Sequence, residues 1–271
     1  MTTGRVRVSV DEDGVAAVTL DRPDKMNALD PAMFDALREA GETLCQRTDV
    51  RAVVLHGEGR AFCAGLDMAS FERLGAGGAL EMTGGASISA RTHGMANAPQ
   101  QAVLVWRQMP VPVVAAVHGV AYGGGLQVAL GADLRFVAPG TRLSVMEIRW
   151  GLVPDMGGMV LMRRLLRDDV MRDLVCSGRV VEADEAVRVG LATRVCDDPL
   201  AEARAWAREV AGRSPSAIRA ARRLLAAAAS ADDARLLQAE SDEQAALLGA
   251  PDQVEAVRAN LERRPPRFAR P

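Results

Sequence analysis

The sequence predicts an α/β fold in which a core of strands and helices is followed by a purely helical region. Up to about residue 198, apolar runs with strand character alternate with amphipathic stretches. From Pro199 onward the strands stop, and helices rich in Ala, Arg and Leu take over. Strands tend to occur in pairs before a helix, which favours stacked ββα turns over a strictly alternating βαβ sheet. We therefore expect a ββα core at 1–198 and a helical region at 199–271.

The individual elements are predicted from alternating apolar and polar residues, from helix-capping residues and from prolines that begin helices. Val6–Val10 and Val15–Leu20 alternate as strands, and DEDG between them has the composition of a turn. Asp30 is the expected N-cap of a helix that has Pro31 in its first turn. The later core is predicted as strands at 52–56, 111–118 and 134–138, helices at 100–108 and 126–131, and a loop over much of 74–99. Prolines punctuate the C-terminal helices expected at 199–212, 215–229, 232–248 and 251–262.

Composition excludes several classes of protein. The 271 residues carry a formal charge of −2, so no cationic field attracts nucleic acid or an anionic membrane. No apolar run reaches the roughly 18 residues of a membrane helix, and the first residues lack an apolar signal region. The four cysteines form no C-x-x-C pair and the three histidines are isolated, so we expect reduced thiols, structural histidines and no metal site. The predicted location is the cytoplasm.

A run of three glycines precedes the helix expected at 126–131. Val128 stands where a G-x-G-x-x-G motif would need glycine, which argues against dinucleotide binding, and neither a phosphate loop nor a G-x-S-x-G elbow occurs. Glycines at a strand-to-helix junction permit positive φ and let a ligand approach the unpaired N–H groups of the helix. The run is therefore either an oxyanion site or a place of close packing. The stretch 60–68 is a second glycine-containing junction of this kind.

Several motifs together resemble a known family. They occur in order and at familiar separations over residues 5–265: RPDKMNALD, AFCAGLDM, AVHGVAYGGG, GADLRF and EIRWGLVPDMGG. This combination resembles the crotonase superfamily, the enoyl-CoA hydratases and isomerases. The resemblance implies a spiral of ββα turns with a helical C-terminal trimerisation region, packed as a homotrimer or a dimer of trimers.

The resemblance also implies an acyl-CoA thioester as substrate, with no cofactor beyond the coenzyme A that the substrate carries. Two backbone N–H groups would donate to the thioester oxygen, and these map onto Leu66 and Gly124. Fixed donors aimed at a developing oxyanion are worth roughly 3–4 kcal/mol each. Lys25 is the only lysine in the chain and either meets a phosphate or is a solvated loop residue. The residues implied to lie along coenzyme A are Lys25, Met26, Ala64, Asp67 and Met68.

The expected catalytic acids differ from those of a hydratase. Members of the family that hydrate use two glutamates, which map onto Gln127 and Glu147. An amide cannot exchange a proton near pH 7, so Gln127 argues against standard hydration. Glu147 alone is sufficient to move a double bond, unless it is merely the ion-pair partner of Arg142 or Arg149. Asp155 lies eight residues after Glu147, as in dienoyl-CoA isomerases, or it caps a helix over 156–166.

Three functions follow from the resemblance and this acid pattern. The leading prediction is double-bond isomerisation of an enoyl-CoA through a stabilised enolate, with Glu147 as acid and base. The alternatives are a hydratase that adds water to a 2-enoyl-CoA and a catalytically weakened module that binds acyl-CoA. Both glycine junctions and Glu147 are retained, which favours an enzyme.

Overall fold

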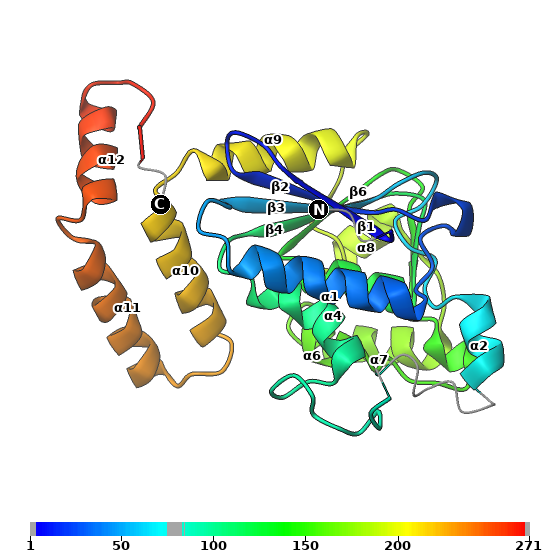
Figure 1. Cartoon of the computed structure of the whole chain (residues 1–271). Helices are drawn as coiled ribbons and strands as arrows, with labels where there is room; N and C mark the ends of the chain where they lie inside the picture. Colours follow the sequence, from blue (N-terminus) through cyan, green and yellow to red (C-terminus); the bar gives the residue numbers. More distant parts are fainter. Residues whose placement is uncertain (1–3, 75–82, 84, 269–271) are drawn as a thin grey trace.

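Residues 4–74, 83 and 85–268 are described by the computed structural model, and they form two β-sheets covered by helices (Figure 1). The larger sheet has the order β1-β2-β3-β4-β6-β9, in which β1 and β2 are antiparallel and the later pairs are parallel. In the smaller sheet, β7 pairs in parallel with β5 and antiparallel with β8. The strands are β1 Val6–Val10, β2 Val15–Leu20, β3 Ala52–Gly57, β4 Val113–Val117, β5 Val120–Tyr122, β6 Leu134–Val137, β7 Arg142–Ser144, β8 Val181–Glu182 and β9 Arg194–Val195.

Helices connect these strands and form the C-terminal part of the chain. The core helices are η1 Pro23–Lys25, α1 Pro31–Cys45, α2 Met68–Leu74, α4 Ala98–Gln108, α5 Gly124–Gly131, η2 Glu147–Trp150, α6 Gly158–Met162, α7 Asp168–Ser177 and α8 Ala183–Val189. They are followed by α9 Pro199–Ala211, α10 Pro215–Ala227, α11 Asp233–Leu247 and α12 Pro251–Leu261. Strand pairs followed by a helix recur as β1-β2-α1 and β4-β5-α5, which confirms the predicted ββα arrangement.

The first turn and the first long helix form for the reasons that the sequence suggests. Asp11 Oδ1 accepts a hydrogen bond from Val15 N at 2.9 Å and so closes the turn between β1 and β2. Asp30 Oδ1 accepts from Met33 N at 2.8 Å, and Pro31 occupies the first helical position. A side-chain acceptor at the N-cap satisfies one of the unpaired donors of the helix. Both sequence predictions are confirmed.

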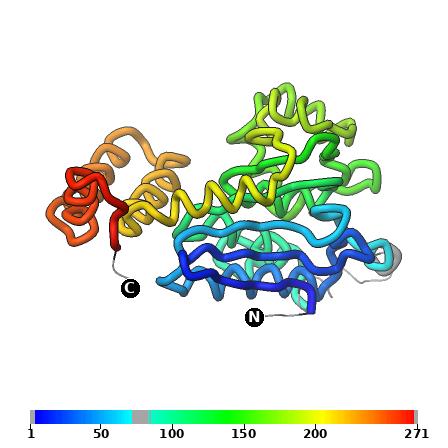
Figure 2. Tube along the Cα trace, turned by 90° about the horizontal axis from the view of Figure 1, so that it is seen from above, coloured from blue at the N-terminus to red at the C-terminus, as the bar shows by residue number. Residues whose placement is uncertain are grey.

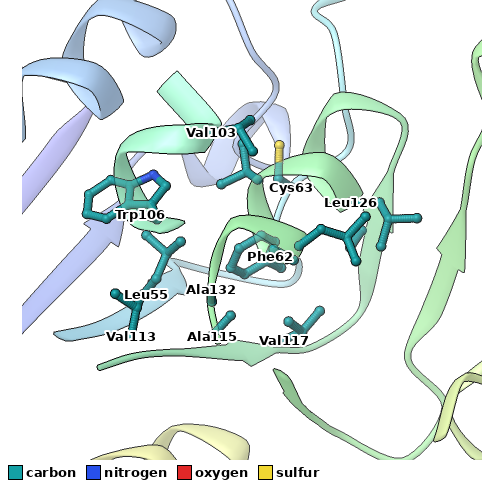
Figure 3. Packing of buried hydrophobic residues seen from close by; sticks show 14 of the residues in the cluster. Leu55, Phe62, Cys63, Val103, Trp106, Val113, Ala115, Val117, Leu126 and Ala132 are labelled. Carbon is teal, nitrogen blue, oxygen red and sulfur yellow. The ribbon is translucent and has the colours of Figure 1, made fainter. Parts of the chain in front are cut away.

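The central strands are buried on both faces, as their continuous apolar composition predicts. Alternate residues of β3 and β4 enter two different clusters. Leu55, Val113 and Ala115 pack against Trp106 of α4 on one face (Figure 3). Val54, Val114 and Ala116 pack on the other face against the alanines that α9 contributes, Ala203, Ala207 and Ala211. The sheet therefore lies between α9 and the pair α1 and α4 (Figure 1).

Other predicted elements differ from the structure mainly at their ends. The helix expected at 126–131 begins two residues earlier, so that two of the three glycines belong to α5. The strand expected at 111–118 is shorter, at Val113–Val117. Of the loop expected over 74–99, residues 75–82 and 84 lie outside the described residues. The expected helix over 156–166 is reduced to α6, Gly158–Met162.

The C-terminal helices divide into one that packs on the sheet and three that project beside the core. Helix α9 runs across the larger sheet, whereas α10, α11 and α12 lie to one side of it (Figures 1 and 2). Arg222 on α10 is buried and donates to the carbonyls of Met109 at 3.0 Å and Arg107 at 3.1 Å, and it pairs with Asp133. These bonds fasten α10 to the end of α4. The four predicted C-terminal helices are confirmed.

The cysteines are unpaired, and the side chains of His56 and His118 form hydrogen bonds within the fold. All four cysteines are free. His56 Nε2 lies 2.9 Å from Thr19 Oγ1, and His118 Nε2 lies 2.9 Å from the carbonyl oxygen of Gly59. Within the described residues, no helix is both long enough and apolar enough to span a membrane.

Candidate active site

A cavity of about 430 Å³ opens where α2, α5 and η2 come together. Its walls are mainly apolar, and its polar side chains include Gln127, Glu147 and Asp155. Apolar pockets with a few convergent polar groups are the usual form of small-molecule sites. The apolar lining includes Leu29, Phe34, Leu66, Phe71, Ile88, Met146, Trp150, Leu152, Val153 and Met156.

The first glycine junction forms one wall of this cavity. Main-chain hydrogen bonds tie it to the segment before α1: Leu29 N donates to Gly65 O at 2.8 Å, and Asp67 N donates to Leu29 O at 2.9 Å. Gly65 has φ +93°, and a Cβ there would lie 2.6 Å from Tyr122 O. Only glycine fits this conformation and this contact. The N–H of the next residue, Leu66, donates to none of the described residues.

The glycine run also lines the cavity. Gly123 has φ +51° and is the N-cap of α5, and its N–H donates to Ser144 O at 2.9 Å. A Cβ at Gly125 would lie 2.4 Å from Cys63 O, and one at Gly124 would lie 2.9 Å from Met156 Sδ. Close packing is therefore one reason for the run. The N–H of Gly124 has no acceptor among the described residues, so the predicted donor role is open to it as well.

The two junctions lie side by side. Cys63 N donates to Val120 O and Tyr122 N donates to Cys63 O, each at 3.1 Å, so the two segments run parallel for a short distance. A Cβ at Gly65 would lie 3.9 Å from Gly124 N. The structure thus brings together Leu66 and Gly124, the residues predicted to supply two N–H donors to one oxygen. Their joint action on a ligand stays a prediction.

Gln127 and Glu147 form a hydrogen-bonded pair at the end of the cavity. Gln127 lies on α5, Glu147 begins η2, and both are buried. Gln127 Nε2 donates to Glu147 Oε1 at 2.7 Å. Glu147 Oε2 is also buried, and no described residue forms a hydrogen bond to it. Glu147 forms no ion pair with a described residue, so the alternative of pairing with Arg142 or Arg149 is wrong.

The surroundings of Glu147 raise the pKa of its carboxyl group. Burial raises the pKa of Glu147, the hydrogen bond from Gln127 opposes that rise, and the charge of Asp155 adds to it. A carboxyl group with a raised pKa is better suited both to accept and to return a proton. The arrangement can therefore move a proton to and from a bound ligand.

Asp155 lies in the segment between η2 and α6 and lines the same cavity. Helix α6 begins at Gly158 after the N-cap Gly157, and no side chain caps it, so the capping role considered for Asp155 is wrong. Partial removal of the Asp155 carboxyl group from solvent raises its pKa, although the residue as a whole is exposed. Gln100 Nε2 donates to the main-chain carbonyl of Asp155 at 3.1 Å and holds this segment against α4.

The residues predicted to lie along coenzyme A occupy three different surroundings. Ala64 and Met68 line the cavity, and Met68 is exposed. Lys25 is exposed at the end of η1, and Met26 follows it in the left-handed conformation and accepts from Ala64 N at 2.9 Å. Asp67 is buried, and its carboxylate pairs with Arg22 at 2.6 Å. The Asp67 side chain is therefore committed to holding the loop, and its main-chain N–H already donates to Leu29 O, so its contact with coenzyme A stays a prediction.

Sequence reasoning missed two features of this site. Phe71 of α2 and Trp150 of η2 stack with ring centroids 4.7 Å apart, and both line the cavity. Arg22 holds Asp67, and its Nη1 also donates to Ala28 O at 3.1 Å. A lone aromatic or arginine in a loop gives no periodic signal, so only the folded chain shows these contacts.

Comparisons with known proteins agree over nearly the whole chain. Residues 11–271 match the family model described as enoyl-CoA hydratase/isomerase. A Thermus thermophilus protein provisionally named enoyl-CoA hydratase is 36% identical over 266 residues, which cover 96% of this chain and 100% of that protein. The "Probable enoyl-CoA hydratase echA6" of Mycobacterium leprae is 32% identical over 265 residues, which cover 94% of this chain and 96% of that protein.

Solved structures give the same result. A structure from Streptomyces coelicolor A3(2), provisionally named enoyl-CoA hydratase, has a TM-score of 0.86 at 34% identity and covers 100% of this chain and 96% of that chain. The resemblance that the sequence motifs predicted is confirmed, and so is the α/β fold with a helical C-terminal region that it implied, whereas the trimer stays a prediction.

Proposed function

Because the chain belongs to the enoyl-CoA hydratase/isomerase family, the crotonase superfamily, we propose that it moves the double bond of an enoyl-CoA with Glu147 as acid and base. The observation that carries this proposal is the pair formed by Gln127 and Glu147. The amide donates to the carboxylate and cannot exchange a proton, so this pair contains one proton carrier instead of two. One carrier suits a reaction in which a proton leaves one carbon and returns to another.

The proposed reaction starts from a 3-enoyl-CoA. Glu147 Oε2 takes a proton from C2, and the electron pair of the broken C–H bond moves into the thioester to form a dienolate. The N–H groups of Leu66 and Gly124 donate to the oxygen that gains the negative charge. Glu147 then returns the proton to C4, the double bond moves to C2–C3, and no water enters or leaves. No cofactor is needed beyond the coenzyme A of the substrate.

A second candidate function is hydration of a 2-enoyl-CoA. The names of the relatives favour it, since both the T. thermophilus and the M. leprae proteins are named as hydratases. Asp155, which lines the same cavity, would then have to supply the second proton carrier. Asp155 is also the proposed partner of Glu147 if the substrate is a 3,5-dienoyl-CoA. A third candidate, an acyl-CoA-binding module, predicts affinity without turnover on any of these substrates.

The test is a panel of 2-enoyl-, 3-enoyl- and 3,5-dienoyl-CoA substrates with the mass of each product measured. Isomerisation leaves the mass unchanged, whereas hydration adds one water. The proposal expects turnover of the 3-enoyl substrate at unchanged mass. Addition of water to the 2-enoyl substrate as the faster reaction would favour the hydratase instead.

Glu147→Gln tests the assigned residue. We expect turnover to fall by at least roughly a hundredfold while acyl-CoA affinity stays within a few-fold, because the base is lost and the shape is kept. Glu39→Gln, at an exposed position on α1, is the matched control and should keep full activity. Near-normal turnover of Glu147→Gln would overturn the assignment.

A further inference from the structure

Both ends of the Gln127 side chain are engaged, and they hold two different parts of the site. Its Nε2 donates to Glu147 Oε1 at 2.7 Å. Its Oε1 accepts from the main-chain N–H of Met156 at 2.9 Å and from that of Gly158 at 2.8 Å. The side chain is 2% exposed, so water does not compete for these bonds. A single amide thus joins η2 to the turn that carries Asp155 into α6.

The turn is shaped around this amide. A Cβ at Gly158 would lie 2.7 Å from Gln127 Oε1 and 3.0 Å from its Cδ, so any larger residue there would displace the side chain. Gly157 has φ +95° and brings the two N–H groups of the turn toward the same oxygen. The Gln127 side chain can therefore occupy this position only because residue 158 is a glycine.

The hydrogen bond from the Gln127 amide also leaves one particular oxygen of Glu147, Oε2, free to contact a ligand. Oε1 is committed to Gln127 Nε2, and Oε2 is buried with its hydrogen-bonding capacity unmet among the described residues. A glutamate side chain has three rotatable bonds, and a catalytic group that is misplaced by about 1 Å can cost a hundredfold in rate. A fixed donor on one oxygen therefore holds the other in a single orientation.

We propose that Gln127 is a positioning residue, whose amide clamps the Glu147 carboxylate with its nitrogen and the turn at 156–158 with its oxygen. The base and the wall that carries Asp155 are thereby held as one unit. This inference rests on the proposed role of Glu147 as the base. It goes beyond that role, because it assigns a function to the residue that replaces the second acid of a hydratase.

The test is Gln127→Met, which keeps the length of the side chain and removes both its donor and its acceptor. We expect kcat on the substrate that the wild type turns over to fall about ten- to a hundredfold, with KM changed by no more than a few-fold. The acid limb of the pH–rate profile should move to higher pH, because the hydrogen bond from Gln127 favours the ionised form of Glu147. A merely structural role would lower the amount of folded enzyme and leave this limb in place.

The matched control is Gln101→Met. Gln101 is a buried glutamine on α4 that donates to Gln108 at 3.1 Å and does not line the cavity, so this variant should keep the wild-type pH profile and kcat. Glu147→Gln in the same assay separates the two proposals. If Glu147→Gln is inactive but Gln127→Met keeps both kcat and pH profile, the positioning role is overturned and the base assignment stands. If Glu147→Gln remains active, the base assignment itself fails.

Discussion

At position 127, replacing the amide with a carboxylate adds a second group that can exchange a proton with a ligand. In Gln127→Glu, one oxygen keeps the two N–H donors of the turn at 156–158, and the other faces Glu147 where the amide nitrogen now lies at 2.7 Å. Two carboxyls at this distance share a proton, so that one donates while the other accepts. We expect a gain in water addition to a 2-enoyl-CoA, with isomerisation of the 3-enoyl substrate kept or reduced.

The assay for this variant is product mass on both substrates. If the wild type already hydrates at rates typical of enzymes and Gln127→Glu changes nothing, residue 127 does not discriminate between the reactions. Asp155 then becomes the second proton carrier, and Asp155→Asn should stop hydration in the same assay.

The pH dependence of kcat/KM should reveal the effect of the Asp155 charge on Glu147. Glu147 acts as a base only when ionised, so kcat/KM should fall as the pH drops through the pKa of this group in the free enzyme. Burial raises that pKa and the charge of Asp155 raises it further, so the fall should occur above the ordinary range of glutamate. Asp155→Asn removes this charge, and the acid limb should therefore move to lower pH. An unmoved limb would show that Asp155 does not influence the base.

At the scale of elements, the sequence predicted best those segments whose cause is local. The β1-β2 hairpin and the start of α1 depend on Asp11, Asp30 and Pro31, whose effects act within a few residues. Strands β5, β7, β8 and β9 have two or three residues each and carry no periodic signal. They form because the rest of the chain places their partners beside them.

The same distinction applies to the site. Family motifs pointed to Glu147, Gln127 and Asp155, and the structure places all three around one cavity. No pattern in the sequence indicated that Gln127 would bond Glu147 and the 156–158 turn at once, because these segments are separated by 20 to 31 residues. The stacking of Phe71 on Trp150 depends on a similar long-range approach.

The first glycine junction offers a stability test at this scale. Gly65→Ala must accept φ +93° and a Cβ 2.6 Å from Tyr122 O, whereas Gly140→Ala must accept φ +71° with no atom within 4 Å. The control, Gly140→Ala, should lower the free energy of unfolding by about 1–2 kcal/mol through its backbone conformation alone. Gly65→Ala should lose about 1–3 kcal/mol more through overpacking, and activity as well, because the N–H of Leu66 shifts. Urea unfolding measures the difference, and equal losses would mean that the contact with Tyr122 is not restrictive.

At the scale of the whole molecule, the C-terminal helices are anchored to the core through α10 and leave apolar side chains exposed. Arg222 fastens α10 to Met109 and Asp133 of the core. Beyond this point the helices α10–α12 lie beside the core (Figure 2). These helices and the C-cap of α11 expose large apolar side chains, Leu225, Leu237, Leu248, Val254, Val257 and Leu261. Where exposed apolar side chains lie together on one surface, they usually mark a protein interface.

We expect these helices to bring copies of the chain together as a trimer or a hexamer. Fully burying one leucine is worth about 1.5–3 kcal/mol, so several such residues repeated around a closed ring can stabilise the assembly. Sedimentation at micromolar concentration should give a multiple of 28.8 kDa, and a mass near 28.8 kDa itself would contradict the prediction. Leu237→Glu, at a side chain that is 62% exposed in the single chain, should reduce the mass without unfolding the core. Arg235→Glu, on the same helix at an already polar and exposed position, is the matched control and should keep the assembled mass. If both variants sediment like the wild type, the interface does not include this part of α11.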